Sequence, residues 1–120
     1  MKYDWFDEYC LEKKGASKDF KEEWQWERYL ICGKMFAAIC GDNGENKLFT
    51  LKCEPAVGLM LREKYEDIIP GYYMNKVHWN SVKISGIVPD EVIKQMIDMS
   101  YSLVLWSMTK KAQKEINDAN

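Results

Sequence analysis

The feature that most constrains the fold is a turn-forming segment, GDNGEN at residues 41–46, which separates two stretches that favour β-strands. Glycine and asparagine tolerate the backbone angles that tight turns require. After the turn, residues 47–53 alternate, so that three apolar side chains share one side of an extended chain. This pattern predicts that residues 34–40 and 47–53 pair as an antiparallel hairpin.

Two other segments favour strands. Residues 23–41 are rich in aromatic and other strand-favouring residues and are interrupted by Gly33, which predicts two strands or one bent strand. Residues 79–85, WNSVKIS, alternate and predict a short, half-buried strand. Residues 15–21 are polar, and we expect them to form a connection.

Three segments carry helical signals. Residues 3–14 begin with acidic residues, among which Asp4 is the expected N-cap. Residues 54–65 have Pro55 in the expected first turn, and the last helix begins at Pro89. The middle helix is expected to face inward at Val57, Met60 and Leu61. The last helix carries an apolar stripe at the helical period: Ile93, Met96, Ile97, Tyr101, Val104, Leu105 and Met108.

The order of these elements predicts an α+β fold. An antiparallel sheet carries N-terminal, middle and C-terminal helices against one face. The chain has 120 residues, of which 47% are hydrophobic and 30% charged, a composition typical of one globular domain spanning residues 1–120. Residues 110–120 are polar, and we expect this tail to fray.

The four cysteines lack the CxxC spacing, and the chain contains one histidine, so a zinc site is not expected. The N-terminal residues lack the apolar run of a signal peptide, and no segment approaches the roughly 20 apolar residues that span a bilayer. We therefore expect a cytoplasmic protein with no membrane partner and with reduced, buried thiols. The cysteines are Cys10, Cys32, Cys40 and Cys53.

A series of separated motifs identifies a family. They are Gly33-Lys34-Met35-Phe36-Ala37, Lys52-Cys53-Glu54-Pro55, Pro70-Gly71-Tyr72, Met74-Asn75-Lys76, His78-Trp79-Asn80, Val88-Pro89-Asp90 and Ser100-Tyr101. In content and spacing they resemble the MmcQ/YjbR family, loosely before residue 28 and tightly after residue 51. The resemblance implies an α+β fold similar in outline to the frataxin-like sandwich. It also implies a DNA-binding protein with a double-wing motif.

The leading expectation is therefore a non-enzymatic DNA-binding protein that contacts DNA through the sheet and the 72–79 region. Lysines suit phosphate contacts, and aromatic rings suit stacking. The expected contact residues are Lys34, Lys52, Tyr72, Asn75, Lys76, His78, Trp79 and Lys83. DNA binding requires the lysines of this set to share a face with His78. The net charge of −2 gives no independent support, so ordinary solvated strand lysines remain the alternative interpretation.

The alternative function is a small-molecule or protein binding module at the same region, where aromatic walls and a few polar groups would form a pocket. The residues expected to bound it are Tyr72, Met74, Asn75, His78 and Trp79. Nothing in the sequence names the ligand.

Catalysis and metal binding are weaker hypotheses. A general base at His78 would need orientation by Asn75, Lys76, Tyr72 or Ser81, and no nucleophile motif or phosphate-binding glycine loop accompanies it. The first helix carries carboxylates that would suit a hard cation: Asp4, Asp7, Glu8 and Glu12. An exposed acidic helix face is the usual explanation of such spacing. We therefore expect no catalytic residue, no metal and no cofactor.

Overall fold

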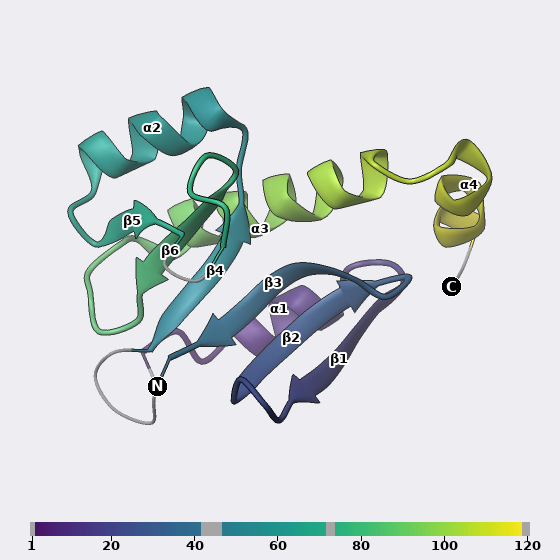
Figure 1. The fold of residues 1–120 in the computed structure, drawn as a ribbon, viewed down its shortest axis with the longest axis horizontal. Coiled ribbons are helices and arrows are strands. Elements are labelled where there is room, and N and C mark those ends of the chain that lie inside the picture. The colour runs from purple at the N-terminus through teal and green to yellow at the C-terminus, as the bar shows by residue number, and fades with distance from the viewer. Residues whose placement is uncertain (1, 42–46, 72–73, 119–120) are drawn as a thin grey trace.

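The structure is a computed structural model, and it describes residues 2–41, 47–71 and 74–118. Figure 1 shows one sheet with helices behind it and above it. The elements, in chain order, are α1 (Phe6–Leu11), β1 (Ala16–Lys21), β2 (Trp26–Ile31), β3 (Lys34–Cys40), β4 (Leu48–Lys52), α2 (Pro55–Lys64), β5 (Ile68–Pro70), β6 (Trp79–Lys83), α3 (Asp90–Trp106) and α4 (Lys110–Asp118). The predicted α+β class is confirmed.

The sheet has six strands in the order β1-β2-β3-β4-β6-β5, and every neighbouring pair is antiparallel. The predicted hairpin is present, because β3 pairs with β4 through partners such as Ala38 and Thr50. Its turn falls on residues 42–46, outside the described residues. The segment interrupted by Gly33 forms two strands, β2 and β3, as one of the two predicted alternatives required.

One face of the sheet is covered by helices, and the main core lies between them. α1 and α3 run behind the sheet in Figure 1. Phe6 of α1 stacks on Phe49 of β4 with ring centroids 3.8 Å apart, and neither ring is exposed. From α3, Ser100 accepts a hydrogen bond from the backbone N–H of Lys52 and donates one to the carbonyl of Phe36. The Phe6–Phe49 stack therefore holds α1 on this covered face, and the hydrogen bonds of Ser100 hold α3 there.

The structure corrects the predictions for the N-terminal region. Residues 16–21 form strand β1 rather than a connection, because their polar side chains pair across to β2 instead of forming a core. The first helix is shorter than predicted, and Trp5, not Asp4, is its N-cap residue. The Tyr3 hydroxyl donates a hydrogen bond of 2.8 Å to the carbonyl of Val88, and this bond holds the segment before α1 against the core.

Two further corrections concern the helices α2 and α4. α2 has the predicted position, but Met60 is exposed and Gly58 is the buried position. A side chain at Gly58 would meet the Asn80 amide, so the missing Cβ lets this side of the helix approach the sheet. The expected frayed tail is a helix, α4, because Ile116 is buried and its side chain lies against Gly15.

The cysteine prediction holds for three residues and fails for one. All four thiols are free, and Cys10, Cys40 and Cys53 are buried. Cys32 is exposed because it lies in the tight turn between β2 and β3, where its φ is 47°. Within the described residues, no helix is both long and apolar enough to cross a membrane.

Candidate functional site

The other face of the sheet, which we call the open face, is defined by strand register. One row of paired residues crosses all six strands: Asp19, Arg28, Ala38, Thr50, Ser81 and Ile69. Residues two positions away on each strand point to the same side. Three buried apolar residues on this face, Trp26, Ala38 and Cys40, form a small separate cluster with the partly buried Met35 and Met74, to which none of the described helices contributes.

The charges on the open face are mostly positive. Among the described strands it carries four basic residues and one acidic residue: Lys21, Arg28, Lys52, Lys83 and Asp19. The face therefore differs in sign from the whole chain, whose net charge is −2. A local excess of lysine and arginine on one face favours polyanions over the average surface of the molecule.

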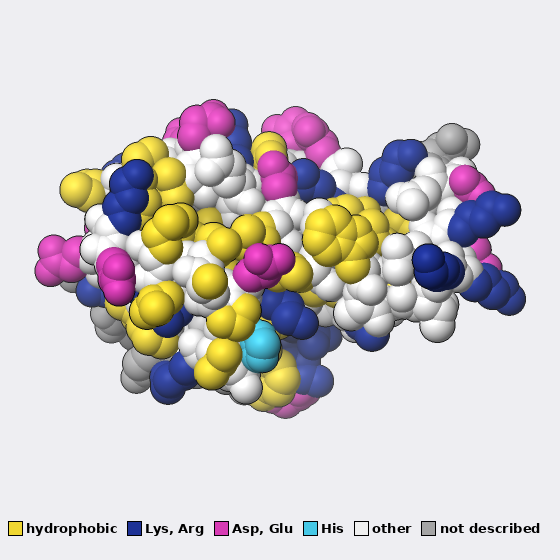
Figure 2. Space-filling view, turned by 90° about the horizontal axis from the view of Figure 1, so that it is seen from above, with side chains coloured by type: hydrophobic (Ala, Val, Ile, Leu, Met, Phe, Trp, Pro, Cys, Tyr) yellow, Lys and Arg dark blue, Asp and Glu magenta, His cyan; other side chains and the backbone are white. Residues whose placement is uncertain are grey.

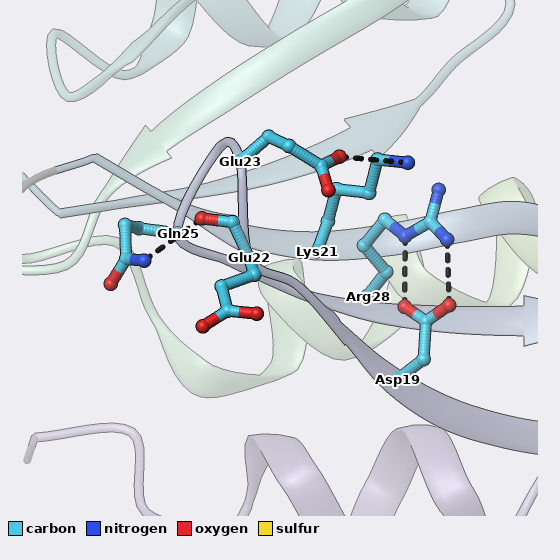
Figure 3. Close-up of polar contacts among 6 residues, drawn as sticks. All are labelled: Asp19, Lys21, Glu22, Glu23, Gln25 and Arg28. Atoms are coloured by element: carbon cyan, nitrogen blue, oxygen red, sulfur yellow. Dashed lines mark hydrogen bonds and ion pairs between the residues drawn. The ribbon is translucent and has the colours of Figure 1, made fainter.

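The one acidic residue on the described strands of the open face is paired with an arginine within the β1–β2 hairpin. Figure 3 shows the Arg28 guanidinium donating two hydrogen bonds to the Asp19 carboxylate, at 2.8 Å and 2.6 Å. These bonds lower the pKa of Asp19. Near the tip of the hairpin, Lys21 forms an ion pair of 3.1 Å with Glu23.

Two lysines of the open face have no such partner. Lys52 lies opposite Trp79 and Lys83 lies opposite Leu48 in the β4–β6 pairing. Neither ammonium forms an ion pair or hydrogen bond with the part of the chain that the structure describes. No described carboxylate therefore competes with an external anion for either charge.

The remaining predicted lysines differ from Lys52 and Lys83, one in its placement and the other in having a hydrogen-bond partner. Lys34 pairs with Ile31, whose side chain belongs to the covered face, so Lys34 is at the β2–β3 turn and does not join Lys52. The Lys76 ammonium donates a hydrogen bond of 3.1 Å to the carbonyl of Gly71. Lys34 is thus separated from Lys52, and the Lys76 ammonium is engaged by a backbone carbonyl.

The polar residues of the 72–79 region mainly shape its turn. The Asn75 carboxamide accepts hydrogen bonds from the backbone N–H groups of Val77, at 2.9 Å, and His78, at 3.3 Å. The carbonyl of His78 accepts a bond of 2.7 Å from the N–H of Cys53, which ties the turn to the end of β4. Asn75 is therefore a structural residue of this turn. Tyr72 and Tyr73 lie outside the described residues.

The histidine side chain is exposed, and Figure 2 shows it at the surface with basic and acidic side chains next to it. Ser81, proposed above as one orienting group, is buried, and its hydroxyl lies 3.2 Å from that of Thr50. The half-buried Trp79 lies beside Lys52 on the open face, one residue away from His78 and on the opposite side of the strand.

A hollow exists near the predicted pocket, but most of the residues that line it are not the ones predicted from the sequence. Met74 lines it together with Trp24, Trp26 and Gly41, and its volume is about 430 Å³. Trp24 and Trp26 contact each other edge to face, with centroids 5.0 Å apart. Sequence reasoning missed both, although their i, i+2 spacing in EWQWER signals that two indoles share one side of an extended chain.

The other candidate groups are poorly suited to nucleophilic chemistry or to metal binding. Burial raises the pKa of the Cys40 thiol to about 11, so it is not a thiolate at neutral pH. Among the described residues, no three histidine, cysteine or acidic side chains form a potential metal site. On α1, the Asp7 carboxylate accepts hydrogen bonds from Lys18 at 2.6 Å and from the Tyr29 hydroxyl at 2.7 Å. Asp7 therefore has an internal structural role, whereas Asp4, Glu8 and Glu12 are exposed.

Solved structures share this architecture. The Deinococcus radiodurans protein DR2400 superposes with a TM-score of 0.85 at 28% identity, covering 95% of this chain and 86% of that one. A Pseudomonas syringae crystal structure, target PsR293, gives a TM-score of 0.71 at 27% identity, covering 86% of this chain and 98% of the other.

Sequence comparison agrees with the structural match. Uncharacterized protein YjbR of Escherichia coli K12 is 30% identical over 95 residues, which are 78% of this chain and 79% of the relative. Uncharacterized protein YyaQ of Bacillus subtilis is 38% identical over 109 residues, and the match covers 77% of this chain and 88% of the relative. The YjbR family model matches residues 11–103, so the chain belongs to the YjbR family, as its motifs predicted.

Proposed function

We propose that the protein is a non-enzymatic DNA-binding protein whose contact surface is the open face of the sheet. The observation that supports this proposal most directly concerns Lys52 and Lys83, which have no partner among the described residues. They lie on a face where the one carboxylate of the described strands is held by Arg28. Lysine ammonium groups displace the counterions condensed on DNA, which favours binding without sequence readout.

The proposed contact set differs from the sequence-based one. Lys21, Lys52 and Lys83 supply phosphate contacts, and the half-buried Trp79 supplies an aromatic surface next to Lys52. Lys34 and Lys76 leave the set because the first lies at the β2–β3 turn and the second bonds Gly71.

The second candidate is a small-molecule or protein binding module at Asn75, His78 and Trp79. It has less support, because the Asn75 carboxamide is engaged in its own turn and the hollow lined by Met74 is bounded by other residues.

The test is a fluorescence-anisotropy titration of labelled, mixed-sequence duplex DNA at several salt concentrations. Binding should weaken with salt, with a log–log slope of about −0.9 for each phosphate contact. Lys52→Ala and Lys83→Ala should each make the slope shallower by about 0.9.

Lys34→Ala is the matched control, since this exposed lysine lies on β3 but not on the open face, and it should leave the slope unchanged. If the wild-type protein binds neither this duplex nor a single strand of the same length at low salt up to about 100 μM, the proposal is wrong, because even nonspecific DNA-binding proteins bind in that range. Equal effects of all three variants would remove the open face as the contact surface.

A further inference from the structure

The hollow between Trp24, Trp26, Gly41 and Met74, which we call the tryptophan pocket, is not explained by phosphate binding. Its volume of about 430 Å³ lies in the range of roughly 300–1,000 Å³ found for small organic ligands. Among the residues that the structure describes, Gly41 contributes only backbone to the lining, and the side chains that line the hollow are two indoles and a thioether. The pocket therefore offers flat apolar surfaces to a flat apolar group.

One wall of the tryptophan pocket is unusually exposed for its residue type. Trp24 lies in the turn between β1 and β2 and leaves 53% of its surface exposed, whereas Trp26 is 6% exposed within the strand. Because Trp24 packs edge to face on Trp26, its ring is held in place at the mouth of the pocket rather than swinging freely in solvent. A ring held in this way is a preformed stacking surface.

A positive charge accompanies this exposed ring. The Lys21 ammonium lies 5.3 Å from the centroid of Trp24, and Lys21 is the register partner of Trp26 on the open face. The strand register then continues from Trp26 across Cys40 and Leu48 to Lys83. With neighbouring strands about 4.8 Å apart, Lys83 is about 14 Å from Trp26 along this row.

This arrangement matches the chemistry of one class of polymer. A flat apolar pocket with cations beside it and farther along the same row complements a planar base attached to a charged backbone. In a duplex the bases are paired and stacked inside, so their flat faces cannot enter such a pocket. In a single strand they are available, and stacking on aromatic side chains is the usual means of holding them.

We infer that the tryptophan pocket receives an unpaired nucleobase, so that the preferred ligand of the open face is single-stranded DNA rather than duplex. This inference rests on the proposed function, because Lys52 and Lys83 hold the backbone while the pocket selects the strand state. The base would lie among Trp24, Trp26 and Met74, the described side chains that line the pocket.

The test compares a labelled oligo-dT strand with a duplex of equal length, by anisotropy at two salt concentrations. Wild-type protein should bind the single strand more tightly. Trp24→Ala should weaken single-strand binding by about tenfold, within the range found when stacked aromatic residues are replaced by alanine. Its salt slope should not change, because stacking releases no counterions, and Trp24→Phe should restore most of the affinity.

Phe20→Ala is the matched control. Phe20 is 54% exposed on the same hairpin, but it pairs with Glu27 and lies on the opposite side of the sheet from Trp26. Its replacement should leave both affinities unchanged.

The outcomes separate the inference from the function on which it rests. Salt-dependent binding with no preference for the single strand, or with equal affinities of Trp24→Ala and Phe20→Ala, overturns the tryptophan pocket and leaves the phosphate contacts standing. Absence of binding to either form overturns both. Single-strand preference that is lost in Trp24→Ala and restored in Trp24→Phe supports the inference.

Discussion

The two faces of this sheet belong to the same strands but differ in the side chains that they carry and in what covers them. The covered face places fully buried rings beneath helices, as in the Phe6–Phe49 stack. The open face places a polar row across its centre, in which the Thr50 and Ser81 hydroxyls are 3.2 Å apart and both residues are buried. Because side chains alternate along a strand, Phe49 and Thr50 serve opposite faces although they are adjacent in sequence.

This division has a practical consequence. Stability from apolar burial is concentrated on the covered face, so the open face retains exposed charges and an exposed indole without depriving the main core of contacts. Substitutions on the open face should therefore change binding and leave folding almost intact. Substitutions on the covered face should do the reverse.

The largest expected effect tests this division within one strand. Phe49→Ala should lower the free energy of unfolding by about 3–5 kcal/mol, because it removes a fully buried ring and leaves a cavity beneath Phe6. Lys52→Ala, three residues along β4, should change it by less than about 0.5 kcal/mol. Urea unfolding monitored by circular dichroism measures both. Similar losses of unfolding free energy for the two variants would mean that both faces contribute comparably to stability.

A smaller effect is expected where α3 is joined to the sheet. Ser100→Ala should destabilise the protein by about 1–3 kcal/mol, because the Lys52 N–H and the Phe36 carbonyl lose their hydroxyl partner. Ser102→Ala is the control on the same helix, at a half-buried position, and should be nearly neutral. The same urea titration compares them. Equal values for the two variants would show that α3 is held by apolar packing alone.

Much of the covered face could be predicted from sequence, because its signals are local. The turn residues and the alternation after them predicted β3 and β4, and the helical stripe predicted α3. β1 was missed because its polar residues become a strand only through pairing with β2, where Arg28 binds Asp19. α4 was missed for a similar reason, since the burial of Ile116 against Gly15 joins distant parts of the chain.

The open face was harder to predict because two kinds of non-local information define it. Alternation shows that Lys52 and Thr50 share a side of β4, but not which side the helices cover. The polarity of Asn75 and Lys76 suggested a binding site, yet their hydrogen bonds are made within the turn. Trp24 had a readable signal in its spacing from Trp26, but its exposure depends on the position of the hairpin.

The smallest expected effect concerns a polar contact at the margin of the covered face. Its contribution to the free energy of unfolding should depend on pH. Hydrogen bonds from Lys18 and Tyr29 lower the pKa of the Asp7 carboxyl, so the carboxylate stabilises the fold above its unfolded pKa of about 3.9. This stabilisation is lost as the pH falls through the lower folded pKa. Asp7→Asn should therefore cost about 1 kcal/mol at pH 7, and progressively less as the pH falls below the unfolded pKa of about 3.9.

Urea titrations at pH 3, 5 and 7 measure this difference, and Asp4→Asn is the matched control. Asp4 is exposed and makes no hydrogen bond with the described residues, so its replacement should change the free energy of unfolding very little. A cost for Asp7→Asn that stays constant with pH would mean that the contact stabilises through packing and not through charge. A cost that vanishes in acid would show that even the covered face depends on an ionised group where α1 meets β1 and β2.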